Sequence, residues 1–132
     1  MVGEEDVSVR MEADILTARQ TGKALAGRLG FTDGDTVLIA TAISEIARNM
    51  LEYARGGTMH FRVLQAPRPG LEIQAEDHGP GIKDLELAMR DGYSTGGGLG
   101  LGLPGAKRLM DDFSISSKLG VGTTVVMRKW VP

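Results

Sequence analysis

The sequence predicts an α/β (α+β) two-layer sandwich, in which one mixed, mostly antiparallel sheet carries helices on a single face. Two long helical patterns come early in the chain, before most of the strand patterns. The later strand patterns come in pairs separated by short turn segments, as in hairpins. This order differs from the regular strand–helix alternation of a parallel, doubly wound sheet.

The N-terminal part of the chain predicts one strand and two helices. Residues 7–11 alternate apolar and polar side chains, which is typical of a strand. Residues 13–29 repeat apolar side chains at helical spacing, and a glycine follows as a stop signal. The second helix is expected to run to about Ala54, with Asp33 or Asp35 as its N-cap and a glycine pair after its end.

The C-terminal part predicts two hairpins, two short helices and a glycine-rich loop. The short helices are expected at 83–90 and 103–110, and the loop at 92–102 lies between them. The four predicted strands alternate apolar and polar residues and occupy 59–64, 71–75, 113–117 and 123–130.

Length and composition restrict the class of protein. The 132 residues predict a single domain over 1–132, and 42% hydrophobic residues are typical of a globular protein. The formal net charge of -2 and the absence of a long basic run disfavour nucleic acid as the main partner.

Cysteine and histidine content disfavours several kinds of site. The chain has no cysteine, which excludes disulfides and thiolate metal sites, and only two histidines, which disfavour a zinc site. The acidic start does not fit a signal peptide, and no apolar stretch approaches the roughly 18 residues that span a bilayer. We therefore expect a cytoplasmic protein without membrane contacts.

A pair of polar residues on the second predicted helix forms the first candidate site. Glu45 and Asn49 are four residues apart, so their side chains share one helix face. The Asn49 side chain offers a neutral oxygen that Mg²⁺ accepts, while Glu45 can act as a base or orient an attacking hydroxyl. Arg48 and Tyr53 are expected on roughly the same side. For this pair taken alone, an ordinary solvated helix face is the simpler interpretation.

A carboxylate at the end of a predicted strand forms the second candidate site. Asp77 is followed by Gly79 and Gly81, which would let a flat base approach closely. The Asp77 carboxylate can then accept a hydrogen bond from an exocyclic amine such as that of adenine. A simple turn after the strand is the alternative, because these residue types favour turns in any case.

A glycine run between the two short helices forms the third candidate. Residues 96–102 carry few side chains that would block a phosphate, and their backbone amides can point at anions. A surface loop without a ligand is the alternative. Thr123, which follows another pair of glycines, could lend a hydroxyl to the base site or could be an ordinary strand residue.

Taken together, these pieces resemble the Bergerat-fold (GHKL) ATP-binding family, which includes gyrase, Hsp90, MutL and histidine kinases. The resemblance covers about Glu45 to Thr123, and the compact length is similar to the RsbT-like branch of bacterial anti-sigma-factor serine kinases. The segments that carry it are 41–49, 75–82, 91–95 and 98–111.

The resemblance implies a role for each matching residue. Glu45 matches the catalytic glutamate, and Asn49 matches the magnesium ligand. Related kinases often place an arginine before the second glycine box, where this chain has Thr95 and Gly96. Arg48 is therefore the first candidate for that charge, with Lys107 and Arg108 as alternatives, or ATP turnover is slow. The implied nucleotide-binding residues are Asn49, Asp77, Gly79, Gly81, Ile82, Gly97, Gly98, Leu99, Gly100, Leu101, Gly102 and Thr123.

The resemblance also implies a function. It points to an ATP- and Mg²⁺-dependent protein serine/threonine kinase that phosphorylates STAS-domain proteins of the RsbS and RsbR type. When released from them, such a kinase would activate a PP2C-type phosphatase of the RsbU type. The chain could act as a homodimer or bound to a stressosome. The alternatives are a non-catalytic interaction module whose surface is shaped by ATP, and the ATP domain of a histidine kinase.

Overall fold

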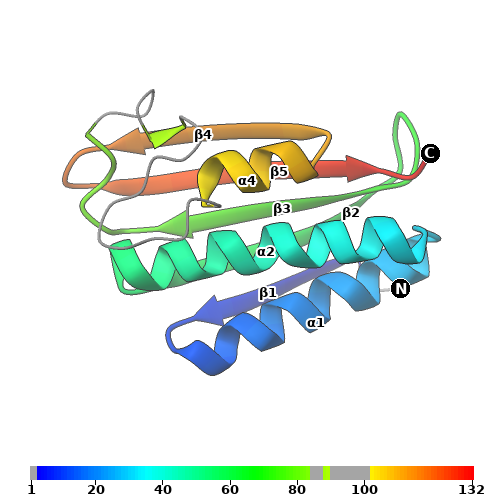
Figure 1. Ribbon diagram of the computed structural model, residues 1–132, viewed down its shortest axis with the longest axis horizontal. Coiled ribbons are helices and arrows are strands. Elements are labelled where there is room, and N and C mark those ends of the chain that lie inside the picture. The colour runs from blue at the N-terminus through cyan, green and yellow to red at the C-terminus, as the bar shows by residue number, and fades with distance from the viewer. Residues whose placement is uncertain (1–2, 84–87, 90–101) are drawn as a thin grey trace.

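The computed structural model describes residues 3–83, 88–89 and 102–132. Figure 1 shows the described helices on one side of a twisted sheet, so the molecule has one helical layer and one strand layer. The elements in chain order are β1 (Glu4–Val9), α1 (Glu12–Leu29), α2 (Asp33–Ala54), β2 (Gly57–Leu64), β3 (Gly70–Asp77), α4 (Leu103–Leu109), β4 (Asp112–Lys118) and β5 (Gly122–Trp130).

The sheet has five strands in the order β1-β2-β3-β5-β4. All four neighbouring pairs are antiparallel. The predicted two-layer α+β class is therefore confirmed. A mixed sheet would contain at least one parallel pair of strands, whereas all strand pairs in the described part are antiparallel. Strand β3 lies in the centre, and its last residue, Asp77, pairs with Thr123 of β5.

The hydrophobic core lies between the sheet and the helices. Every second residue of the central strands faces α1 and α2, which gives the strands one apolar and one polar face. Burying these side chains is the main favourable contribution to folding, at about 1.5–3 kcal/mol for each large one. The largest fully buried side chains are Phe61, Leu25, Ile39, Ile43, Ile46, Met59, Leu71, Ile73, Met127 and Val9.

The ends of the long helices follow local hydrogen-bonding rules. Helix α1 ends at Gly30, which has a φ of 91° and donates its amide to carbonyls of the last turn. Helix α2 begins after Thr32, whose side chain accepts a hydrogen bond of 3.1 Å from the amide of Asp35. The prediction that Asp33 or Asp35 caps α2 was wrong, because the threonine hydroxyl satisfies that amide. The two aspartates lie in the first turn, where their charge still favours the positive end of the helix dipole.

The other element predictions differ mainly at their ends. The first strand begins at Glu4 rather than at residue 7, because three acidic residues also pair with β2. The predicted helix over 83–90 and the loop over 92–102 lie largely outside the described residues. None of the described helices is both long and apolar enough to cross a membrane.

Candidate nucleotide site

Helix α2 carries Glu45 and Asn49 at the border between core and surface. Its buried stripe, which includes Ile43, Ile46 and Met50, fixes the rotation of the helix against the sheet. Glu45 and Asn49 flank this stripe and are half-buried. Both residues lie in α2, as predicted, and four residues apart they share one face of the helix. This face borders the core rather than a fully solvated surface.

The Asn49 side chain lies beside Gly102, the residue that precedes helix α4. A Cβ atom built on Gly102 would be 3.7 Å from both Oδ1 and Nδ2 of Asn49, and α4 packs against α2. Within the described part of the chain, the side-chain amide of Asn49 forms no hydrogen bond. An amide oxygen of this kind, next to the start of a helix, can contribute one ligand to a Mg²⁺ ion that also binds phosphate oxygens.

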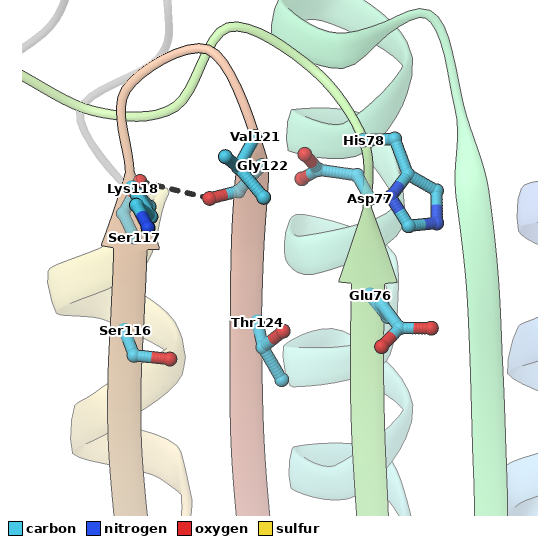
Figure 2. Close-up of a pocket in the computed structure, with 9 residues that line it drawn as sticks. All are labelled: Glu76, Asp77, His78, Ser116, Ser117, Lys118, Val121, Gly122 and Thr124. Carbon is cyan, nitrogen blue, oxygen red and sulfur yellow. Dashed lines mark hydrogen bonds between the residues drawn. The ribbon is translucent and has the colours of Figure 1, made fainter.

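Asp77 ends β3, and its two carboxylate oxygens have different surroundings. Oδ1 accepts a hydrogen bond of 2.9 Å from the amide of Gly79 and one of 3.2 Å from the amide of Thr123. No described residue donates a hydrogen bond to Oδ2. The backbone thus orients the carboxylate and leaves one oxygen available to accept from a ligand amine. Figure 2 shows the Asp77 carboxylate directed toward the neighbouring strand and the His78 ring directed away from it.

The two glycines after Asp77 are required by close packing. A Cβ on Gly79 would come within 2.5 Å of the Ala54 Cβ at the end of α2. Gly81 has a φ of 80°, and a Cβ there would lie 2.5 Å from the carbonyl oxygen of Lys118. The loop therefore fits between the end of α2 and the β4–β5 turn. This packing brings Asp77 to the end of the molecule where Asn49 lies. Asn49 precedes Ala54 by about one and a half helical turns.

Thr123 lies opposite Asp77 on the neighbouring strand β5. It is buried, with 9% of its surface exposed, and its amide donates to Asp77. Its hydroxyl lies 2.8 Å from the hydroxyl of Ser117 on β4. Ser117 Oγ also accepts a hydrogen bond of 2.7 Å from the amide of Ile82. Sequence reasoning missed Ser117, because only the pairing of β4 with β5 places it opposite Thr123.

An open depression of about 250 Å³ lies at these strand ends (Figure 2). Its lining comes from β3, β4, β5 and the β4–β5 turn, and it is mostly polar in residue type. Glu76, Ser116 and Thr124 alternate with residues that face the core, so the depression lies mainly on the sheet face opposite α2 and only its edge reaches Asp77. The lining residues are Glu76, Asp77, His78, Ser116, Ser117, Lys118, Val121, Gly122 and Thr124.

The structure directs Arg48 toward helix α1 rather than toward Asn49. Its Nη1 atom lies 3.2 Å from Oε1 of Glu12, and both side chains are exposed, at 41% and 81%. Such a surface ion pair contributes about 0–1 kcal/mol and can exchange for another partner. The alternative cations, Lys107 and Arg108, are exposed in the last turn of α4.

The structure brings the candidate residues together in part. Asp77, its glycines, Ile82 and Thr123, which are expected at the base, lie together, and Asn49, which is expected at the phosphates, lies beside Gly102. Glu45 lies on the same helix as Asn49, and Arg48 forms an ion pair with Glu12. No cluster of three metal-binding His, Asp or Glu side chains exists in the described ranges. The remaining candidates lie outside the described residues and are Gly97, Gly98, Leu99, Gly100 and Leu101.

Comparison with known proteins gives the family. A family model described as the histidine kinase-like ATPase domain matches residues 9–129. The serine/threonine-protein kinase RsbT of Bacillus subtilis (strain 168) is 50% identical over 126 residues, which are 95% of each chain. The anti-sigma F factor of Thermoanaerobacter sp. (strain X514) is 30% identical over 119 residues, or 86% of this chain and 83% of the relative.

Solved structures show the same fold at low identity. A Mycobacterium tuberculosis protein with RsbU and RsbW domains superposes with a TM-score of 0.68 and 17% identity, covering 98% of this chain and 32% of that one. The mycobacterial sensor histidine kinase MprB gives a TM-score of 0.58 and 16% identity over 96% of both chains. The chain therefore belongs to the histidine kinase-like ATPase domain family and, within it, to the protein kinases of the RsbT type.

Proposed function

We propose that this kinase transfers the γ-phosphoryl group of ATP, with Mg²⁺, to a serine or threonine of STAS-domain proteins of the RsbS and RsbR type. The 50% identity to RsbT supports the reaction class. The observation that carries the proposal is the placement of a backbone-oriented carboxylate, Asp77, at the same end of the molecule as the Asn49 side-chain amide, which lies beside Gly102.

At the base end, Asp77 would select the nucleotide. Its Oδ2 atom is available to accept a hydrogen bond from the exocyclic amine of adenine, because the backbone amides already occupy Oδ1. Thr123, held beside it, would supply a hydroxyl to the ring edge. The glycines of the following loop would allow the flat base to approach the backbone, since no Cβ atom blocks it.

At the phosphate end, Asn49 and Glu45 would have separate tasks. Asn49 would hold Mg²⁺, which supplies positive charge to the phosphate oxygens when bound. Glu45 lies one turn earlier on α2 and would orient the substrate hydroxyl and accept its proton. The hydroxyl oxygen forms a bond to the γ-phosphorus, the bond to the β,γ-bridging oxygen breaks, and ADP leaves.

We also propose a location and partner proteins for this kinase. The kinase would be cytoplasmic and would bind STAS-domain proteins as substrates, either in a stressosome or as a homodimer. After these substrates are phosphorylated, the released kinase would bind and activate a PP2C-type phosphatase of the RsbU type. Support for such partner exchange comes from the relatives that are named anti-sigma factors.

A non-catalytic function is the alternative, and one observation favours it. Arg48, the first candidate for the terminal phosphate, forms an ion pair with Glu12 and so points away from Asn49. A chain without a cation at that phosphate could bind ATP and use it only to shape a partner surface. In that case ATP binding and partner binding would be intact, and no phosphoryl transfer would occur.

Labelled ATP separates the two functions. The purified chain is incubated with Mg²⁺, γ-labelled ATP and the STAS-domain proteins encoded near this gene. Transfer of label to a STAS serine or threonine, lost in the Glu45→Ala variant that still binds ATP, is the expected result. Tight binding of ATP and partner without any labelled STAS protein would instead favour the interaction module. Absence of ATP binding by the wild-type chain would overturn both.

A further inference from the structure

Lys129 is a charged residue on the core side of the sheet. It lies in β5 opposite Leu71 of β3, which is fully buried, and it shares the helix-facing side of its strand with Met127. Only 9% of the Lys129 surface is exposed. Moving an ammonium group out of water costs free energy unless polar partners replace the lost water. The position of Lys129 in the core therefore requires a compensating contact.

That contact is made at the C-terminal end of helix α4. The Nζ atom of Lys129 donates a hydrogen bond of 2.9 Å to the carbonyl oxygen of Leu109, the last residue of α4. The direction of this bond is fixed, because an ammonium group can only donate and a carbonyl can only accept. The carboxylate of Asp111 lies 3.9 Å from the same nitrogen. A positive charge here also balances the negative end of the helix dipole. Lys129 thus attaches α4 to β5.

Helix α4 depends on such contacts for its position. It has only seven residues and contains Pro104 and Gly105, so it is too short and too poor in helix-forming residues to be stable by itself. One side of it packs against α2. Its C-cap residue, Met110, is extended and does not form the left-handed turn that commonly closes a helix. Lys129 supplies a partner for the last carbonyl in place of that turn.

The other end of α4 lies at the phosphate end of the proposed site. Gly102 precedes the helix, and its carbonyl oxygen accepts a hydrogen bond of 3.1 Å from the amide of Ala106. A Cβ atom built on Gly102 would be 3.7 Å from the side-chain oxygen and nitrogen of Asn49. At a rise of 1.5 Å per residue α4 is about 10 Å long, so it moves as one short rigid element. A shift at Leu109 would therefore move Gly102 relative to Asn49.

We propose that Lys129 is a positioning residue: through the Leu109 carbonyl it holds α4 in place and so keeps Gly102 beside Asn49. The inference rests on the proposed ATP site. It assigns to Lys129 no contact with ATP, with Mg²⁺ or with the substrate hydroxyl. Loss of the ammonium group should loosen α4 and lower both the affinity for ATP and the rate of phosphoryl transfer. A displacement of about 1 Å at reacting groups can reduce a rate by about 10²-fold.

Two substitutions and two controls test this role. Lys129→Met removes the donor and keeps a long unbranched side chain, whereas Lys129→Arg keeps the charge and the N–H donors. Lys23→Met is the control for loss of a lysine, because Lys23 is exposed on α1. Thr32→Ala is the control for loss of stability, because it removes the cap at the far end of α2. Calorimetry measures the affinity for ATP with Mg²⁺, a STAS-domain substrate gives kcat, and mass spectrometry follows amide hydrogen exchange in α4.

We expect the Lys129→Met variant to bind ATP about 10-fold more weakly and to have a kcat that is lower by about 10-fold or more. Amide exchange in residues 103–109 should become faster. The Lys129→Arg variant should stay within about threefold of wild type in affinity and kcat, because it can still donate a charge-assisted hydrogen bond. Lys23→Met should behave as wild type. Thr32→Ala should lower Tm and leave the affinity and kcat of the folded protein unchanged, which is the pattern that a purely stabilising lysine would also give.

The outcomes separate this inference from the proposed function. If the wild-type chain binds ATP, and Lys129→Met loses only stability while it binds ATP and transfers phosphate like wild type, the inference fails and the proposed function stands. Equal losses in the arginine and methionine variants would show that the donated hydrogen bond is not what matters, which also overturns it. Should Lys129→Met not fold, Lys129→Gln decides, because its side chain is one bond shorter; wild-type affinity and kcat in that variant would overturn the inference. If wild type binds no ATP, the proposed function itself fails.

Discussion

At the scale of single residues, Asp77 shows how the backbone can prepare a side chain for a ligand. Two backbone amides, from Gly79 and Thr123, donate to Oδ1. Because these donors come from the following loop and from β5, the orientation of the carboxylate depends on the register between β3 and β5. The other oxygen can then accept from a ligand without reorganisation of the side chain.

The Asp77→Asn variant should lose ATP affinity by about 30-fold or more, because an amide NH₂ would face the adenine amine in place of an accepting oxygen. Its remaining oxygen can still accept from the two backbone amides, so the melting temperature should barely change. Titration calorimetry and thermal unfolding measure the two effects. Glu76→Gln is the control, since it changes the adjacent carboxylate and should bind ATP normally. Wild-type affinity in Asp77→Asn would contradict the role of Asp77.

Glu45→Gln should lower kcat by about 10²- to 10⁴-fold, the usual contribution of a positioned base, without weakening ATP binding. Glutamine keeps the size of the side chain and cannot accept a proton, so the variant isolates that function. Phosphoryl transfer to a STAS-domain protein is followed at saturating ATP. Glu52→Gln, on the exposed side of the same helix, should behave as wild type. Full phosphoryl-transfer activity in the Glu45→Gln variant would exclude Glu45 as the base.

At the scale of elements, helix α2 connects fold stability to the site. It spans Asp33–Ala54, buries seven residues and presents Glu45 and Asn49 beside them. Its N-terminal end is capped by Thr32, and its C-terminal end turns through Arg55, which adopts a left-handed conformation with a φ of 62°. The N-terminal end lies about four and a half turns from Asn49, so a change in the Thr32 cap should alter the stability of the helix without altering the site.

Thr32→Ala should lower the free energy of unfolding by about 1 kcal/mol, because the amide of Asp35 loses its acceptor. For a domain of this size the loss corresponds to a drop in Tm of about 3–5 °C. ATP affinity should be unchanged. Thr41→Ala provides the comparison: its exposed hydroxyl bonds only to the carbonyl of Val37 inside the helix, so stability should hold or rise slightly. Equal destabilisation by the two substitutions would argue against a cap at Thr32.

At the scale of the whole molecule, the sheet face opposite the helices carries a row of alternating charges. The strand register aligns acidic and basic residues across all five strands. In the middle of the row, Glu72 forms two ion pairs: its Oε1 lies 3.0 Å from Nη2 of Arg62, and its Oε2 lies 2.8 Å from Nε of Arg128. The Glu72 side chain is only 9% exposed. The row consists of Glu4, Arg62, Glu72, Arg128 and Asp112.

Glu72→Ala should therefore destabilise the fold by about 1–2 kcal/mol. The loss is smaller than for a fully buried pair, because Arg62 and Arg128 are 53% and 41% exposed and can be rehydrated. Denaturant unfolding measures the change, and a double-mutant cycle with Arg128→Ala isolates the pair. Glu4→Ala, at the exposed edge of the same row, should cost less than about 0.5 kcal/mol. If Glu72→Ala left the free energy of unfolding unchanged, the two ion pairs would make no net contribution to stability.

Local sequence patterns determined most of the helices and strands, because helical and strand periodicities extend over only a few neighbouring residues. The helix 13–29 and the hairpin around the proline-rich turn were predicted to within a few residues of their observed ends. The candidate residues of the site could also be read from the sequence, since Asp77, its glycines and the Glu45–Asn49 spacing are local features. Their joint order gave the family resemblance that the comparisons confirm.

Only the tertiary structure decided which distant residues meet. Ser117 and Ile82 are 35 positions apart, and Arg48 and Glu12 are 36 apart, so no local pattern reports either contact. The first contact depends on the order of strands in the sheet, and the second on the packing of α1 against α2. Sequence periodicity sets which face of an element is buried, whereas strand order and helix packing set what that face touches.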